Sequence, residues 1–235
     1  MSSFFNLGYQ KEGAGRPAPT EGAALFFYQL YTYFWNLLFI NLIFILSCLP
    51  IVTIPAAFSA LNRTCIKLIR DKNVLFWMEY RDEFKKSFKR SLWLGIFFAV
   101  IAFICYYLLS LGLTNEGNMY GVLFTIFGAA IGIITAVWCA YTFVLLACLD
   151  LPSRKLRKNA TALMALDRIR ALIVLGILAL AVIVVVGGFP ISLVLILLGG
   201  PVLTQYSICW VVNTPMQKWI IGPYEQEMTG AQQGD

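Results

Sequence analysis

Long stretches without a charged side chain constrain this chain more than any other feature of its sequence. Asp, Glu, Lys and Arg are missing from residues 22–62, 91–115, 117–149 and 171–217. A transmembrane helix needs about 20 apolar residues to cross about 30 Å of hydrocarbon. The middle two stretches each hold one such helix, the last is long enough for two, and the first holds one together with a Pro-bounded junction. The sequence therefore predicts an all-α, polytopic membrane protein, a bundle of five transmembrane helices.

Composition agrees with this fold class. Hydrophobic residues make up 60% of the chain, charged residues 13%, and the mean hydropathy is +0.76, which lies outside the range of soluble domains. We expect one transmembrane domain over residues 23–222, between a mobile N-terminal tail (1–22) and a C-terminal tail (223–235). The predicted spans cover residues 25–48, 91–113, 119–149, 171–186 and 191–213. Amphipathic cytoplasmic helices are predicted at 56–70, 75–90 and 153–170.

The positive charges predict how the chain is oriented. Nine of the 18 Lys and Arg residues lie between positions 63 and 90, and six more lie between positions 154 and 170. In a five-span arrangement with the N-terminus outside, both groups and Lys218 fall on the cytoplasmic side. The positive-inside rule favours that orientation. We expect a multi-pass membrane protein with its N-terminus outside and its C-terminus in the cytoplasm, and with anionic lipids of the inner leaflet rather than nucleic acid as its charged partner.

The segment 56–70 has the clearest amphipathic pattern in the chain. At 100° per residue, Arg63, Lys67 and Arg70 fall close together on one face, and apolar residues such as Leu61 and Leu68 fall opposite. This pattern is typical of a helix lying in a membrane interface. It predicts that the three cations bind lipid phosphates or a protein partner.

Two further sets of residues are candidates for packing or transport. Small residues recur in steps of four at Gly128, Gly132, Ala136 and Ala140, a spacing that lets helices approach closely; contact within the monomer is the simpler interpretation, and a homodimer interface is the other. Polar residues within the predicted spans could line a path: Gln29, Asn36, Gln205 and Ser207. Hydrogen bonding between helices is the simpler interpretation of these four. Gly199, Gly200 and Pro201 predict a kink in the fifth span.

Catalytic and metal-binding chemistry has little support in the sequence. The chain contains no His, which removes the commonest general base and metal ligand. Its six Cys residues form no CxxC motif, no Walker A pattern is present, and no predicted span carries a charge near its centre, where ion-coupled transporters usually have one. We expect no enzymatic activity, no metal and no cofactor.

Several stretches resemble the YesL family of bacterial membrane proteins, a domain of unknown function. The resemblance is carried by FNLG at 5–8, NLLFINLIFILSCLPIVTIPAAFSAL at 36–61, KLIRDKN at 67–73, FKKSFKRSLWLGIF at 84–97 and LRKNATALMAL at 156–166. It implies a polytopic component of the bacterial cytoplasmic membrane, of a kind often encoded beside carbohydrate ABC importers. The resemblance defines no catalytic residues.

These observations lead to one main hypothesis and two alternatives. The main hypothesis is a non-enzymatic accessory component of a carbohydrate ABC uptake system, which acts through its basic cytoplasmic helices and contacts importer subunits. The first alternative is a small autonomous transporter or channel. The second is a membrane module that binds anionic lipid.

Overall fold

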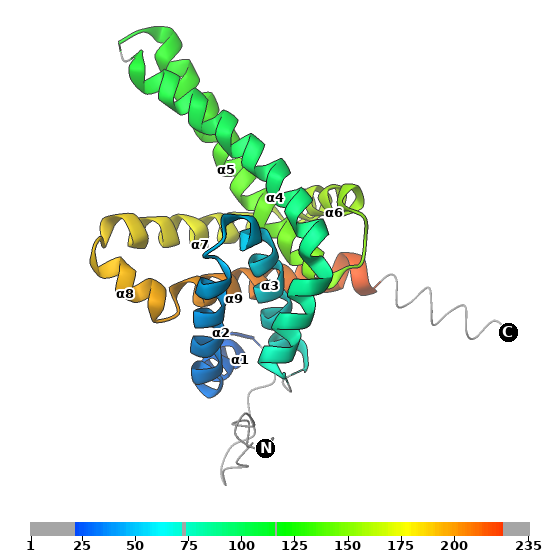
Figure 1. Cartoon of the computed structure of the whole chain (residues 1–235). Coiled ribbons are helices and arrows are strands. Elements are labelled where there is room, and N and C mark those ends of the chain that lie inside the picture. Colours follow the sequence, from blue (N-terminus) through cyan, green and yellow to red (C-terminus); the bar gives the residue numbers. More distant parts are fainter. Residues whose placement is uncertain (1–21, 72–73, 116, 223–235) are drawn as a thin grey trace, which may run out of the picture.

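The computed structural model describes residues 22–71, 74–115 and 117–222, which form helices and short connections with no strand among them (Figure 1). The predicted all-α fold is therefore confirmed. The predicted N-terminal tail, except for Gly22, and the predicted C-terminal tail at 223–235 lie outside the described residues.

The helices follow one another with short connections. In chain order they are α1 (Gly22–Thr32), α2 (Phe34–Ser47), the 3-10 turn η1 (Ile51–Thr53), α3 (Ile54–Asp71), α4 (Phe76–Thr114), α5 (Met119–Cys148), α6 (Ser153–Leu166), α7 (Arg168–Gly187), α8 (Ile191–Leu197), α9 (Gly200–Met216) and the π-helical segment η2 (Gln217–Ile221).

Three of these helices, α4, α5 and α7, are long and apolar enough to cross a membrane by themselves. Two bent pairs of helices are each long and apolar enough to form one further span if taken together: α1 with α2, bent by 72°, and α8 with the helix from Gly200 to Ile221, bent by 61°. By length and composition the described chain thus has three to five spans. The sequence prediction of five requires each bent pair to count as one.

The first bent pair replaces the straight helix predicted over 25–48. The bend lies at Tyr33, and it turns α1 towards α3 and α9. There the Gln29 amide donates to the Leu68 carbonyl at 3.1 Å and accepts from the Tyr206 hydroxyl at 2.7 Å. The ring of Phe26 also packs on Tyr206, with centroids 5.1 Å apart. These contacts explain the bend, and they connect residues too far apart in the chain for sequence periodicity to reveal.

The predicted cytoplasmic helix 75–90 and the predicted span 91–113 are one continuous helix of 39 residues, α4. No proline interrupts the chain where the charged part meets the apolar part, and Ser91 at that point donates its hydroxyl to the Ser87 carbonyl of the same helix at 2.7 Å. Nothing local therefore ends the helix at that point.

The predicted helix 153–170 is shorter, because Asp167 ends it. The Asp167 carboxylate accepts the backbone N–H of Arg170 at 3.2 Å and so caps the start of α7. The last basic residues of that segment, Arg168 and Arg170, consequently belong to α7. The predicted kink near Gly199 is present: Gly199 adopts a φ of 111° at the break between α8 and α9, a conformation that favours glycine.

Helix α3 lies at the centre of the fold and packs against α2, α4, α5 and α9. Three small residues on it, Ala56, Ala57 and Ala60, are fully buried and let its neighbours approach closely. The α4–α5 hairpin begins in this core and then projects well beyond the other helices (Figure 1).

The burial of α5 changes abruptly along its length. Every residue from 141 to 147 is buried, because α3, α4, α6, α7 and α9 surround this end of the helix. Most residues from 119 to 136 are at least partly exposed and apolar, and only Gly121 and Gly128 are buried there. The inner end of α5 is thus packed like a protein core, whereas the rest is packed on one side only, by α4.

Candidate functional site

The three cations predicted to bind lipid or a partner are paired within the chain. Arg63 donates from Nη1 to the carbonyl of Ala147 at 3.2 Å. Lys67 forms an ion pair with Glu79 of α4, and Arg70 donates from Nε to the amide oxygen of Asn213 at 3.0 Å.

Each of these contacts reaches a different neighbour of α3. Arg63 contacts the end of α5, Lys67 contacts α4 and Arg70 contacts α9. Hydrogen bonds from charged donors are stronger than neutral ones, so the basic face fastens the central helix to the bundle. Binding of lipid or a partner by these residues stays a prediction, and it would require these contacts to be shared or exchanged.

A cluster of buried polar side chains joins α1, α3 and α9. The Gln205 amide donates to Oδ1 of Asn62, and the Cys209 thiol lies 3.2 Å from the same oxygen. Next to this pair, Tyr206 donates to Gln29. Asn62, Gln29 and Tyr206 are at most about 1% exposed, so the hydrogen bonds of this cluster lie within the core. Among the described residues, Nδ2 of Asn62 has no hydrogen-bond partner.

The predicted polar path is thus only partly brought together. Gln29 and Gln205 both take part in the cluster at α9, but they bond to Tyr206 and Asn62, respectively. Ser207 donates at 2.8 Å to the Leu203 carbonyl of its own helix, and Asn36 lies half-buried on α2. This arrangement favours the role of hydrogen bonding between helices.

We expect the Asn62–Gln205 pair to show energetic coupling. The variants Asn62→Leu, Gln205→Leu and the double variant should give a coupling free energy of about 0.6–2 kcal/mol in a double-mutant cycle, the range for buried hydrogen bonds between membrane helices. Unfolding of the purified protein in detergent measures it. Ser207→Ala is the control, expected to couple with neither residue. A coupling energy indistinguishable from zero would contradict the hydrogen bond.

A buried carboxylate on α4 escaped the sequence analysis. Glu83 lies in the predicted amphipathic helix 75–90 and is only 7% exposed. Its Oε1 accepts from the hydroxyls of Ser59, at 3.4 Å, and Ser87. The buried stripe of α4 passes through Phe76, Tyr80, Glu83, Ser87 and Leu94. The helical spacing of this stripe is visible in the sequence, but the sequence alone does not distinguish a buried Glu from a solvent-exposed Glu.

The small residues of α5 do not share one environment. A Cβ atom at Gly128 would lie 3.1–3.2 Å from Leu108 and Leu109 of α4, so Gly128 does allow close contact within the monomer. At Gly132 it would meet nothing within 4 Å. Ala136 is exposed and Ala140 half-buried. The structure thus accounts for Gly128, and the homodimer alternative for the others stays a prediction.

Most of the exposed positive charge lies on α4 and α6 instead of α3, with Arg168 of α7 and Lys218 of η2 also exposed. Exposed cations include Lys89 and Arg90 on α4 and Arg154, Lys155 and Lys158 on α6. Asp150, in the α5–α6 connection, accepts from Lys86 at 2.7 Å and from Arg90 at 3.1 Å. The hydrogen bond from Lys86 holds the pKa of Asp150 below its usual value, and the charges of Lys86 and Arg90 add to this effect. Asp150 thus remains ionised and ties the connection to α4.

One face of the first half of α4 is exposed and chemically mixed. It carries Trp77, Met78, Arg81, Asp82 and Lys85, spaced so that they share one side of the helix, away from the buried stripe. We call these five residues the α4 stripe. Trp77 is 48% exposed.

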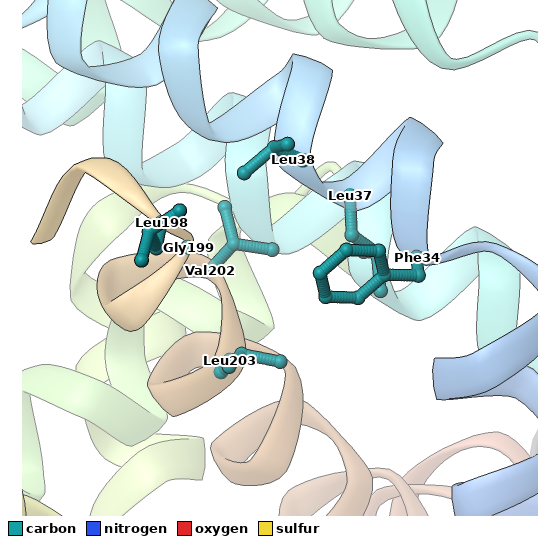
Figure 2. Close-up of a pocket in the computed structure, with 7 residues that line it drawn as sticks. All are labelled: Phe34, Leu37, Leu38, Leu198, Gly199, Val202 and Leu203. Atoms are coloured by element: carbon teal, nitrogen blue, oxygen red, sulfur yellow. The ribbon is translucent and has the colours of Figure 1, made fainter. Parts of the chain in front are cut away.

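A shallow apolar depression lies between α2 and the break that separates α8 from α9. Figure 2 shows its lining, which comes from Phe34, Leu37, Leu38, Leu198, Gly199, Val202 and Leu203. No side chain in this lining carries a polar group, so the depression suits hydrocarbon and offers nothing to a polar substrate. Elsewhere in the described residues, no group of three or more His, Cys, Asp or Glu could hold a metal ion.

Fold and site together define an all-helical membrane protein whose polar side chains mainly join its helices. A model of the family described as "Protein of unknown function, DUF624" matches residues 35–108, about a third of the chain. The match runs from the start of α2, through α3, into the apolar part of α4. Comparison with curated proteins and with solved structures gives no match.

Proposed function

We propose that this protein is a non-enzymatic accessory component of a bacterial carbohydrate ABC importer and contacts an importer subunit through the α4 stripe. The exposure of this stripe is the observation that carries the proposal. Trp, Met and Arg are enriched at the centres of protein interfaces. The carbohydrate importer as partner comes from the resemblance to the YesL family.

The arrangement of charge supports an orientation for this contact. With five spans and the N-terminus outside, the positive-inside rule puts the first half of α4 in the cytoplasm of a bacterium and the C-terminus on the same side. The α4 stripe then faces the compartment in which the ATPase subunits of importers reside. The fixed packing of α3 beneath α4 supplies a rigid base for such a contact.

The autonomous transporter or channel is the less favoured alternative. Gln29 and Gln205, the two fully or largely buried members of its predicted path, hydrogen-bond to Tyr206 and Asn62. A path for a polar solute through them would require both bonds to open, which leaves buried polar groups unpaired at about 1–3 kcal/mol each.

Co-purification from native membranes tests the proposal. Importer subunits, identified by mass spectrometry, should be recovered with the wild-type chain in mild detergent. The double variant Trp77→Ala/Arg81→Ala should reduce recovery by at least about tenfold, as expected for loss of an interface anchor. Trp93 is also exposed but lies further towards the C-terminal end of the same helix. Trp93→Ala is the matched control and should leave recovery unchanged. Recovery of no importer subunit with any of these proteins would refute the proposal.

A further inference from the structure

Both helices of the α4–α5 hairpin change from charged or buried to exposed and apolar near the base of the hairpin, within about two helical turns of each other. On α4 the last charged residue is Arg90, and Trp93, one turn later, is 73% exposed. On α5 the fully buried run ends at Tyr141, and the half-buried Trp138 lies one turn beyond it towards the tip. A tryptophan between charged and apolar surface is typical of a membrane interface.

The length of the hairpin beyond this level matches a bilayer. From Trp93 to Thr114, α4 extends about 33 Å, and from Met119 to Trp138, α5 extends about 30 Å, at 1.5 Å per residue. Both lengths agree with a hydrocarbon layer of about 30 Å. Many of the residues on these parts are exposed and apolar, including Val100, Phe103 and Ile126. Trp138 packs on Phe97 and Phe98, so it lies about 7 Å further along α4 than Trp93. The two tryptophans therefore lie on either side of one boundary of the hydrocarbon.

Helix α6 is fixed against the hairpin at the same level. The guanidinium of Arg157 lies 4.1 Å from the ring centroid of Phe97 on α4. On α5, the indole N–H of Trp138 donates to the carbonyl of Arg157 at 3.3 Å. Leu156, Ala160 and Leu163 bury the inner face of α6, and Figure 1 shows the helix beside the lower part of the hairpin.

The outer face of α6 carries unpaired positive charge. Arg154, Lys155 and Lys158 are exposed, as is Lys89 on α4. Among the described residues none of these four forms an ion pair, and the nearby Asp150 is already bound to Lys86 and Arg90. The cations thus face outward at the level where the lipid-facing surface begins.

We propose that these four cations, which we call the α6 collar, bind the headgroups of anionic phospholipids at the surface of the bilayer. A lipid headgroup layer at this level accounts at once for the unpaired charge, for the exposed Trp93 and for the switch in burial along α5. Phosphate groups suit Lys and Arg donors. The α4 stripe lies nearer the N-terminal end of α4 and shares no residue with the collar. The proposal therefore does not depend on the importer as partner.

Lipid titration of the purified full-length chain in mild detergent tests the collar. Short-chain phosphatidylglycerol should bind more tightly than phosphatidylcholine of the same chain length. Each cation near an anionic surface contributes about fivefold in affinity, so Lys155→Gln/Lys158→Gln should weaken phosphatidylglycerol binding roughly 25-fold. Arg81→Gln/Lys85→Gln removes the same amount of charge from the α4 stripe. Its affinity for phosphatidylglycerol should stay within about threefold of that of the wild type.

Other outcomes would overturn the proposal. Equal losses in the two double variants would mean a diffuse charge effect, and equal binding of the two lipids by the wild type would mean that headgroup charge is not recognised. Competition by millimolar inorganic phosphate would point to a free-anion site instead of a lipid surface. Matching thermal unfolding profiles establish that the variants are folded.

Fluorescence quenching in bilayers tests the level of the collar independently. Variants that retain only Trp93 or only Trp77, with the other tryptophans replaced by Phe, are reconstituted into phosphatidylcholine–phosphatidylglycerol vesicles that contain lipids brominated near the headgroup. Trp93 should be strongly quenched and Trp77, about 24 Å lower along α4, should not. Quenching of Trp77 as strong as that of Trp93 would place the boundary elsewhere and refute the collar.

Discussion

Leu145→Ala should destabilise the protein by about 2–5 kcal/mol, the range for removing a large apolar side chain from a core. Leu145 is fully buried in the inner end of α5, where other helices surround it. The truncation removes three carbon atoms and leaves a cavity, because the packed neighbours relax only in part. Reversible unfolding of the purified protein in detergent, followed by circular dichroism, measures the loss.

Ile134→Ala is the matched control for this prediction. Ile134 lies on the same helix, but it is 61% exposed on the projecting part of the hairpin. There the side chain contacts lipid or detergent both in the folded protein and in the separated helix. We therefore expect the free energy of unfolding to change by no more than about 0.5 kcal/mol. Similar losses for the two variants would contradict the division of α5 into a protein-packed end and a lipid-facing end.

Gly95→Ala should be destabilising by about 1–3 kcal/mol, although alanine favours helices more than glycine does. A Cβ atom at Gly95 would lie 2.3 Å from Cγ and 2.8 Å from Cβ of Pro55. The proline ring is rigid and begins α3, so relief of the clash requires α3 and α4 to move apart. The melting temperature of the purified variant should therefore fall.

Gly132→Ala tests the same substitution where there is space. A Cβ atom at Gly132 meets nothing within 4 Å, so only the helix propensity changes, by up to about 1 kcal/mol in favour of alanine. We expect unchanged or slightly raised stability. If Gly95→Ala were as harmless as this control, the close contact between Pro55 and α4 would be wrong.

Both predictions depend on the position of α3, which has a further consequence for function. A helix with three cations on one face could lie in a membrane surface, yet here Arg63, Lys67 and Arg70 each contact a different neighbouring helix. Most of the exposed positive charge is on α4 and α6 instead. Experiments on partner or lipid binding should therefore begin with those two helices, since changes on α3 would also disturb the fold.

The sequence by itself determined what depends on local composition. The charge-free stretches predicted helices long enough to span a membrane, and α4, α5 and α7 are such helices. Glycine and proline predicted the break at Gly199, because a positive φ is a local property of the backbone. The chain also showed where basic residues are concentrated.

Only the tertiary structure decided what depends on contacts between distant residues. The bend at Tyr33 accompanies the bonds from Gln29 to Leu68 and Tyr206, which are 39 and 177 positions away. Whether Arg70 faces lipid or Asn213 depends on where α9 packs, and a helical wheel contains no information about a neighbouring helix. Periodicity gives the face of a helix, whereas packing determines which face becomes surface and which becomes core.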